Sequence, residues 1–173
     1  MSEVTFERHS GEQTLMILDD IIDLYDDINS ELGYESVEIF SRKSFIARTK
    51  RQMEKDGFEL ITVRSDDVLV GFSFGLTFPP GIWWADATPP TTEILDASKF
   101  AVIELDVQSS YRGRGFGKRL LQTLLEHRYE KFATLTAIPD DPAYSMYIRW
   151  GWHKQGEFTG DGQAMDVLML PLS

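Results

Sequence analysis

Residues 107–118 read Val-Gln-Ser-Ser-Tyr-Arg-Gly-Arg-Gly-Phe-Gly-Lys, a stretch in which a strand pattern runs through a glycine-rich turn into a helix pattern. The backbone N–H groups of such a turn converge on one point, and the N-terminus of the following helix adds partial positive charge. Glycine lets the backbone approach a phosphate closely, because a side chain would block it. Four cations accompany the turn: Arg112, Arg114, Lys118 and Arg119. The segment therefore predicts a site for a pyrophosphate group.

The spacing of the glycines separates this turn from two common nucleotide-binding motifs. The ATP-binding loop requires G-x-x-x-x-G-K-[ST], but Arg112 stands where the first glycine would be. The dinucleotide fingerprint requires G-x-G-x-x-G, whereas Gly113, Gly115 and Gly117 give G-x-G-x-G. Neither motif fits.

The patterns on both sides of the turn predict a layered domain. Residues 100–108 form a strand pattern, and residues 117–132 form an amphipathic helix pattern that ends with Tyr129 on its apolar face. Further strands are expected at residues 4–8, 58–64, 68–78, 133–138, 154–158 and 166–172, and further helices at 12–32, 41–57 and 142–150. A hairpin turn is expected at residues 65–67, and a long irregular loop at 79–98. This order predicts an α/β or α+β domain with a mixed sheet.

Composition narrows the class of protein. The formal net charge of −11 argues against nucleic acid as a partner. The absence of cysteine excludes disulfides, zinc-thiolate sites and cysteine nucleophiles. His9, His127 and His153 show no metal-ligand spacing, so no metal is expected. The first residues lack a signal-peptide pattern, and no stretch is apolar for the length a bilayer needs. We therefore expect one cytoplasmic domain over residues 1–173, with no membrane partner.

Two features of the first hundred residues bear on a substrate. Nine acids and no Lys or Arg lie between residues 12 and 38: Glu12, Asp19, Asp20, Asp23, Asp26, Asp27, Glu31, Glu35 and Glu38. They form either a solvated helix face or a field that attracts a cationic substrate. Trp83 and Trp84, in the proline-rich loop, either fill the core or wall a site for a cationic or sugar-like ligand.

The glycine spacing matches a known family. Arg112-x-x-Gly115-x-Gly117 resembles the R/Q-x-x-G-x-G/A signature of the GNAT superfamily of acyl-CoA N-acyltransferases, and the match extends back to Leu105-x-Val107. The resemblance implies a GNAT-like three-layer domain, with a mixed, mostly antiparallel central sheet flanked by helices.

A second segment strengthens this resemblance. Ala143-x-x-x-Tyr147-x-x-x-Gly151-Trp152 is similar to the A-x-x-x-Y-x-x-x-G-F segment of the same family. The two segments occur in the family's order, with a helix pattern and a strand pattern between them.

The resemblance implies roles for individual residues. The backbone of residues 112–118 would hold the coenzyme A pyrophosphate; these residues are Arg112, Gly113, Arg114, Gly115, Phe116, Gly117 and Lys118. The backbone from Leu105 to Val107 would pair with the pantetheine arm, and the Val107 amide would polarise the thioester carbonyl. Tyr147 would protonate the leaving thiolate, unless it is only a packed aromatic.

The general base has two candidates on the strand itself. Glu104 and Asp106 share one face, and carboxylates in a core strand are costly without a partner or a task. We prefer Glu104, while direct action by Asp106, a water chain or a purely structural role stays open.

The predicted function is direct transfer of acetyl from acetyl-CoA to an amine, with a cationic small molecule as the expected acceptor. One alternative is a non-catalytic acyl-CoA-binding or regulatory module, and another is a nucleotide-binding protein that uses the glycine loop for ATP. A homodimer is left open.

Overall fold

The computed structural model describes residues 2–160 and 162–172. Within them, seven strands form a mostly antiparallel sheet in the order β1-β2-β3-β4-β5-β7-β6. The strands are β1 (Val4–His9), β2 (Glu59–Ser65), β3 (Val68–Phe78), β4 (Lys99–Val107), β5 (Phe132–Ala137), β6 (His153–Glu157) and β7 (Asp166–Pro171). The helices are α1 (Gly11–Leu15), α2 (Leu18–Glu31), α3 (Arg42–Gln52), α4 (Thr92–Leu95), α5 (Phe116–Leu125) and α6 (Pro142–Arg149), with 3₁₀ turns η1 (Glu38–Phe40) and η2 (Ser109–Tyr111).

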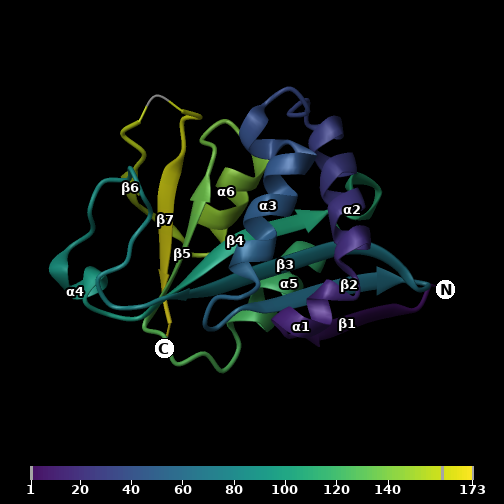
Figure 1. Cartoon of the computed structure of the whole chain (residues 1–173), viewed down its shortest axis with the longest axis horizontal. Coiled ribbons are helices and arrows are strands. Elements are labelled where there is room, and N and C mark those ends of the chain that lie inside the picture. The colour runs from purple at the N-terminus through teal and green to yellow at the C-terminus, as the bar shows by residue number, and fades with distance from the viewer. Residues whose placement is uncertain (1, 161, 173) are drawn as a thin grey trace. The chain divides into compact units, whose positions relative to one another are not determined.

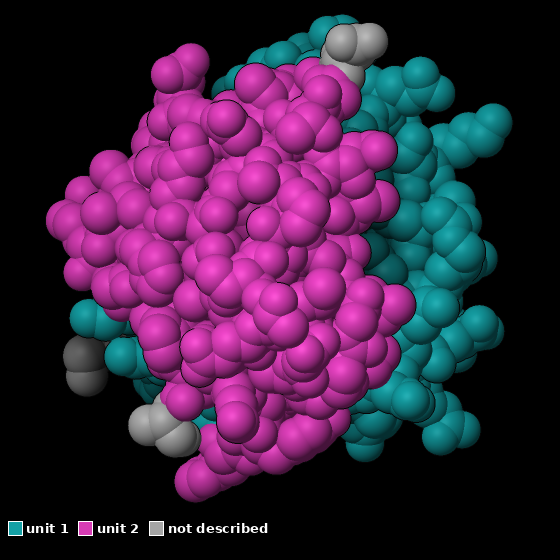
Figure 2. Space-filling model, turned by 90° about the vertical axis from the view of Figure 1, so that its left-hand side faces the viewer, with its two compact units in different colours: residues 1–76, 104–126 teal, residues 77–103, 127–173 magenta. Residues whose placement is uncertain are grey.

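The chain forms two compact units (Figure 2). The first unit comprises residues 1–76 and 104–126, and the second comprises residues 77–103 and 127–173. Strands β3 and β4 each contribute residues to both. Among the described residues, every helix is too short or too polar to cross a membrane.

The first unit is built on antiparallel strands. Strand β1 pairs with β2 from Val4 opposite Ser65 to His9 opposite Leu60, and β2 pairs with β3 through the expected hairpin. The turn residues Asp66 and Asp67 have φ values of 49° and 68°, the left-handed conformation that tight hairpins require. Figure 1 draws α2 and α3 in front of β2 and β3, and α5 behind them.

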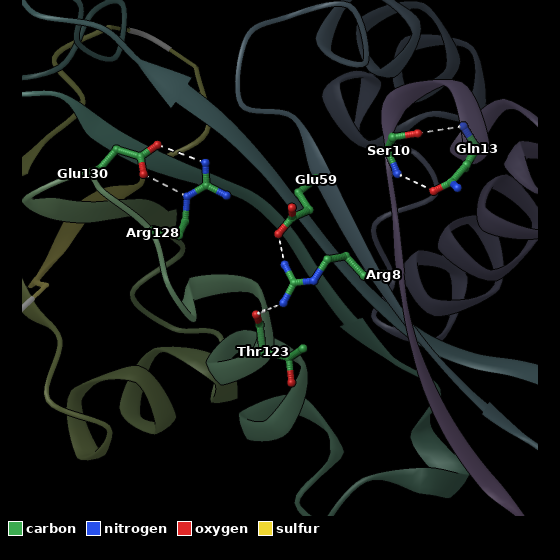
Figure 3. A network of polar contacts seen from close by, with 7 residues as sticks. All are labelled: Arg8, Ser10, Gln13, Glu59, Thr123, Arg128 and Glu130. Atoms are coloured by element: carbon green, nitrogen blue, oxygen red, sulfur yellow. Dashed lines mark hydrogen bonds and ion pairs between the residues drawn. The ribbon is translucent and has the colours of Figure 1, made fainter.

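The helix expected at residues 12–32 is two helices. Ser10 caps α1 through a reciprocal pair of bonds with Gln13 (Figure 3). The chain then leaves the helical conformation at Ile17, with φ −119° and ψ 11°, before α2 begins. Because the break turns the apolar face, Leu15 is 58% exposed, whereas the α2 residues Ile21, Tyr25 and Ile28 are buried at helical spacing.

Ring stacking and an ionic contact join elements of the first unit. The rings of Tyr25 and Phe45 stack with centroids 3.7 Å apart, which joins α2 to α3. Arg8 of β1 pairs with Glu59 of β2 and donates 2.8 Å to the backbone oxygen of Thr123, near the end of α5 (Figure 3). Ser41 caps α3 by accepting from the Ser44 amide, as its position predicts.

The second unit contains the strands on the other side of β4. Strand β5 pairs antiparallel with β7, and β7 pairs antiparallel with β6. Strand β4 begins parallel to β5, with Lys99 opposite Phe132 and Ala101 opposite Thr134.

The segment at residues 79–98, expected to be irregular, contains the short helix α4 and is held by a buried lysine. The Lys99 ammonium donates to the backbone oxygens of Pro79, Leu95 and Ala97 at 3.2, 2.9 and 2.9 Å. Burial lowers the pKa of this ammonium. Trp84 donates 3.0 Å to the Thr134 hydroxyl. The segment is also tied by an isolated antiparallel bridge between Ala87 and Phe158.

Helix α5 is shorter than predicted. It ends at Leu125, and the chain turns at His127 with φ 59°. Tyr129, expected on its buried face, is 74% exposed. The segment after the helix is held by a buried ion pair instead, in which Arg128 donates a hydrogen bond of 2.9 Å to Glu130 (Figure 3). The Thr77 hydroxyl donates a hydrogen bond of 2.8 Å to the same carboxylate.

Candidate functional site

The glycine-rich turn needs glycine because of its backbone conformation. Gly113 and Gly115 have φ values of 79° and 82°, a conformation that residues with a Cβ atom rarely adopt. A Cβ atom at either position would meet no heavy atom of the described residues within 4 Å. The turn is therefore open to solvent, with room for a ligand against its backbone. Gly117 differs, because it lies inside the first turn of α5.

The turn leads directly into the N-terminus of α5. Gly115 is the residue before the first helical position, and glycine cannot cap the helix with a side chain. The Arg119 amide makes the first backbone bond, 3.1 Å to the Gly115 oxygen. The earlier amides of the helix start therefore remain for an anionic ligand.

The basic side chains of the turn hold its backbone in place and also give it positive charge. The Nε atom of Arg112 donates a hydrogen bond of 3.0 Å to the Val107 oxygen, and Arg114 donates one of 3.4 Å to the Ser110 oxygen. The Arg114 guanidinium also lies 4.9 Å from the centre of the Tyr111 ring. These contacts fix the turn to the end of β4 and to η2 while keeping positive charge beside it.

The end of β4 extends past its paired stretch. Pairing with β5 covers residues from Lys99 to Ala101, but the strand continues to Val107, and its last five residues are only half-buried. The Gln108 amide donates 2.8 Å to the Val70 oxygen of β3. Since backbone groups of alternate residues point to opposite edges of a strand, those of Leu105 and Val107 point away from β3. Among the described residues this edge has no paired strand past Ala101, although the Val107 oxygen accepts from Arg112, and an unpaired edge has the form that an extended substrate arm needs.

Two carboxyl groups lie on the face of this strand that meets α3. Glu104 lies 3.7 Å from the Nη2 atom of Arg48, and the two side chains are 17% and 22% exposed. Burial raises the pKa of Glu104 well above its ordinary value, and the charge and hydrogen bonding of Asp106 raise it further. The charge of Arg48 opposes both effects. The arrangement can accept and hold a proton at a higher pH than an exposed carboxylate can.

Tyr147 belongs to the second unit. It lies on α6, whose first turn contains Pro142 and is capped by Asp141. The Tyr147 side chain is buried, and the edges of two rings meet it, with centroids of Trp150 and Trp152 at 5.9 and 6.2 Å. Tyr147 is therefore a packed aromatic residue, and its catalytic role stays a prediction.

Most of the predicted site residues lie in the first unit: Glu104, Leu105, Val107, Arg112, Gly113, Arg114, Gly115, Phe116, Gly117 and Lys118. Tyr147 lies in the other unit. The sequence reasoning missed Arg48 and the Tyr25 hydroxyl that accepts from it at 2.8 Å. Tyr25 lies at helical spacing with Ile21 and Ile28, a pattern that predicts burial, whereas nothing in the local pattern marks Arg48.

The acidic stretch is partly neutralised in the fold. Arg42 lies 3.0 Å from Asp23 and 3.7 Å from Asp26, and Arg64 lies 3.8 Å from Asp20. The acids that the sequence leaves without nearby cations therefore gain some from α3 and β2. Among the described residues, no group of three or more His, Cys, Asp or Glu side chains is arranged to hold a metal ion.

Comparisons with known proteins show the family and the fold of the chain. A family model described as the acetyltransferase (GNAT) family matches residues 18–152. The fold matches the structure of PH1933 from Pyrococcus horikoshii OT3, with a TM-score of 0.68, 20% identity and 99% of each chain covered. It also matches the PaiA N-acetyltransferase of Thermoplasma acidophilum in complex with coenzyme A, with a TM-score of 0.64, 14% identity, and 98% of this chain and 99% of that chain covered.

A third structure has a defined acceptor. The ribosomal-protein-S18-alanine N-acetyltransferase of Escherichia coli matches with a TM-score of 0.65 and 14% identity, covering 99% of this chain and 95% of that chain. At these identities the structures establish a shared fold. A search of curated protein sequences found no match.

Proposed function

The chain belongs to the acetyltransferase (GNAT) family, and on that premise we propose that it transfers an acetyl group from acetyl-CoA directly to an amine. The observation that carries the proposal is the open turn at Gly113 and Gly115, which leads into the free N-terminus of α5 just after a strand with a free edge. The turn fits a pyrophosphate, and the edge fits the pantetheine arm. We also propose that residues 1–173 form one domain, and the family match over residues 18–152, which includes residues of both units, supports this.

The chemistry begins with a proton. The Glu104–Asp106 pair takes it from the acceptor ammonium, directly or through water, and so frees the nitrogen lone pair. The nitrogen bonds to the thioester carbonyl carbon, and the carbon–sulfur bond breaks. The Val107 amide stabilises the negative charge that grows on the carbonyl oxygen. Of the three ammonium protons, one stays on the amide, one ends on the coenzyme A sulfur and one is released to solvent.

Tyr147 is the proposed donor to the departing sulfur. A phenol with an ordinary pKa of about 10 can protonate a thiolate whose conjugate thiol has a pKa of about 8.5 only when the two groups are held together. The support for this role is the match of the Ala143–Tyr147 segment to the family pattern, together with burial of the ring. A proton from the attacking nitrogen then restores the phenol.

We further propose a cationic small molecule as the acceptor. The support is the acidic surface of α2, on which Asp19 and Asp27 are exposed, together with the buried carboxyl pair. The E. coli structural neighbour acylates a ribosomal-protein alanine, so the fold by itself accommodates more than one acceptor class.

Thiol release provides the test. The purified chain is incubated with acetyl-CoA and matched cationic, neutral and acidic amines, and free coenzyme A is followed with a chromogenic thiol reagent. Because the chain has no cysteine, the protein contributes no thiol signal. Mass spectrometry of the acceptor separates transfer from hydrolysis.

We expect transfer to cationic amines that is lost in Glu104→Gln. Coenzyme A binding without transfer to any amine would favour the non-catalytic module. Displacement of coenzyme A by ATP at similar concentration would favour the nucleotide-binding reading.

A further inference from the structure

Arg48 joins three elements of the first unit at the carboxyl pair. Arg48 lies on α3. Its Nη1 atom donates a hydrogen bond of 2.6 Å to the Ile39 oxygen of η1, and its Nη2 atom donates one of 2.8 Å to the Tyr25 hydroxyl of α2. The same Nη2 atom lies 3.7 Å from the Glu104 carboxylate of β4. The guanidinium is therefore held in place by two hydrogen bonds that do not involve the carboxyl pair.

Aromatic packing restricts the guanidinium further. Its central carbon lies 5.8 Å from the centre of the Tyr25 ring and 5.5 Å from that of Phe45, and these two rings stack on each other. Contacts of this kind favour a cation over a neutral side chain. A positive charge held by contacts outside the carboxyl pair thus faces Glu104.

We infer that Arg48 is a positioning residue that holds the Glu104 carboxyl and, through its charge, sets the pH range in which the Glu104–Asp106 pair can take a proton from the acceptor. The inference rests on the proposed function, in which that pair is the base. It extends the function to a residue that belongs neither to the glycine turn nor to the second family segment.

The charges around the pair give the direction of the effect. Asp106 faces Glu104 from the same strand, Arg48 faces it from α3, and the Tyr25 hydroxyl lies on the α2 side. Burial, with the charge of Glu104, raises the pKa of Tyr25, so this hydroxyl stays neutral and adds no opposing charge. Arg48 is then the one cation among these groups. Its removal leaves two like-charged carboxyls together, which must raise the pKa of Glu104 further.

The experiment compares Arg48→Gln with Arg48→Lys. Glutamine removes the charge and keeps a hydrogen-bond donor, whereas lysine keeps the charge and loses the planar guanidinium with its two Nη donors. Arg51→Gln is the matched control, because Arg51 lies on the same helix and its side chain is exposed. Two quantities are measured for each: the pH profile of kcat/KM, and the titration of the Glu104 carboxyl by infrared difference spectroscopy without substrate. Glu104→Gln identifies the band.

We expect the Glu104 titration and the acidic limb of the rate profile to move up together by about one pH unit in Arg48→Gln, a tenfold change in proton affinity. Arg48→Lys and Arg51→Gln should stay near the wild-type position. An unmoved Glu104 titration in a folded Arg48→Gln protein overturns the inference, as does an equal shift in Arg48→Lys.

The two measurements separate the inference from the proposed function. If the carboxyl titration moves and the rate profile does not, the pair is not the base, although Arg48 still controls its proton. If Arg48→Gln does not fold, which thermal unfolding reports, Arg48→Lys decides: its titration must remain at the wild-type position for the inference to hold.

Discussion

Replacing Gly115 with alanine should weaken coenzyme A binding by an amount that the backbone predicts. Gly115 has a φ of 82°, and a residue with a Cβ atom pays roughly 1–2 kcal/mol to adopt this left-handed conformation. Because the new methyl group meets no described atom within 4 Å, the cost is conformational rather than steric. The turn is exposed, so in the free protein it can relax to relieve the strain. Coenzyme binding must then restore the strained conformation.

The expected loss follows directly from this cost. A penalty of about 1–2 kcal/mol corresponds to a coenzyme A dissociation constant raised by about 5-fold to 30-fold. Gly115→Asn should lose less, because asparagine tolerates left-handed backbone better than alanine does. Gly117→Ala should lose least, since Gly117 lies in the first turn of α5, where alanine is a good helix former. Isothermal titration calorimetry at fixed ionic strength measures all three.

The control is a glycine with the same conformation in another place. Gly33 follows α2 with a φ of 77°, and a Cβ there also meets no described atom within 4 Å. Gly33→Ala should carry a similar conformational penalty and leave coenzyme A affinity unchanged. The reasoning is wrong if folded Gly115→Ala binds coenzyme A within twofold of wild type, or if Gly33→Ala weakens binding equally.

Three further results are expected. Tyr147→Phe should lower kcat by about 100-fold with unchanged coenzyme A affinity, whereas full activity would leave Tyr147 as a packing residue. Glu130→Gln should destabilise the fold at neutral pH by about 3–5 kcal/mol, because it leaves Arg128 buried without its charge partner. Burial alone would raise the pKa of Glu130, but hydrogen bonds from Arg128 and Thr77 outweigh it and lower that pKa in the folded protein. The stabilisation from the ion pair is therefore present above the pKa of Glu130 in the unfolded chain and is lost as pH falls through its pKa in the folded protein. Denaturant unfolding across acidic pH should show the stabilities of wild type and Glu130→Gln converge. KM for a cationic acceptor should rise with ionic strength, since exposed charges are screened beyond about 10 Å at 0.1 M salt, and a flat response would remove the steering argument.

The parts of the fold that could be predicted are those whose signals are local. The Asp66–Asp67 turn, the Ser41 cap and the strand flanking the glycine turn each depend on a few adjacent residues. Helix ends were less predictable where apolar spacing continues past them. Leu15 and Tyr129 both fit a helical period, yet both are exposed. In each case the chain leaves the helix at a residue whose conformation the spacing does not reveal.

The same distinction between local and tertiary signals holds for the candidate site. The glycine turn and the alternation of Glu104 with Asp106 are visible in the sequence, because each lies within one element. The partners of Arg48 come from η1, α2 and β4, which are far apart along the chain. An arginine on a helix is most often a solvated side chain, so only the tertiary structure identifies this one as facing the carboxyl pair.

The carboxyl pair itself argues for chemistry over packing. Two acids share the α3 face of β4, and burial and mutual repulsion make the charged form of Glu104 unfavourable. Arg48 offsets only part of that cost, because it lies 3.7 Å away and its two short hydrogen bonds go to the Ile39 oxygen and the Tyr25 hydroxyl. A structural ion pair would place the guanidinium in bidentate contact with one carboxylate and would not need the second acid. The arrangement instead leaves the charge of Glu104 only partly compensated, which is what the proposed uptake of a proton from an acceptor ammonium requires.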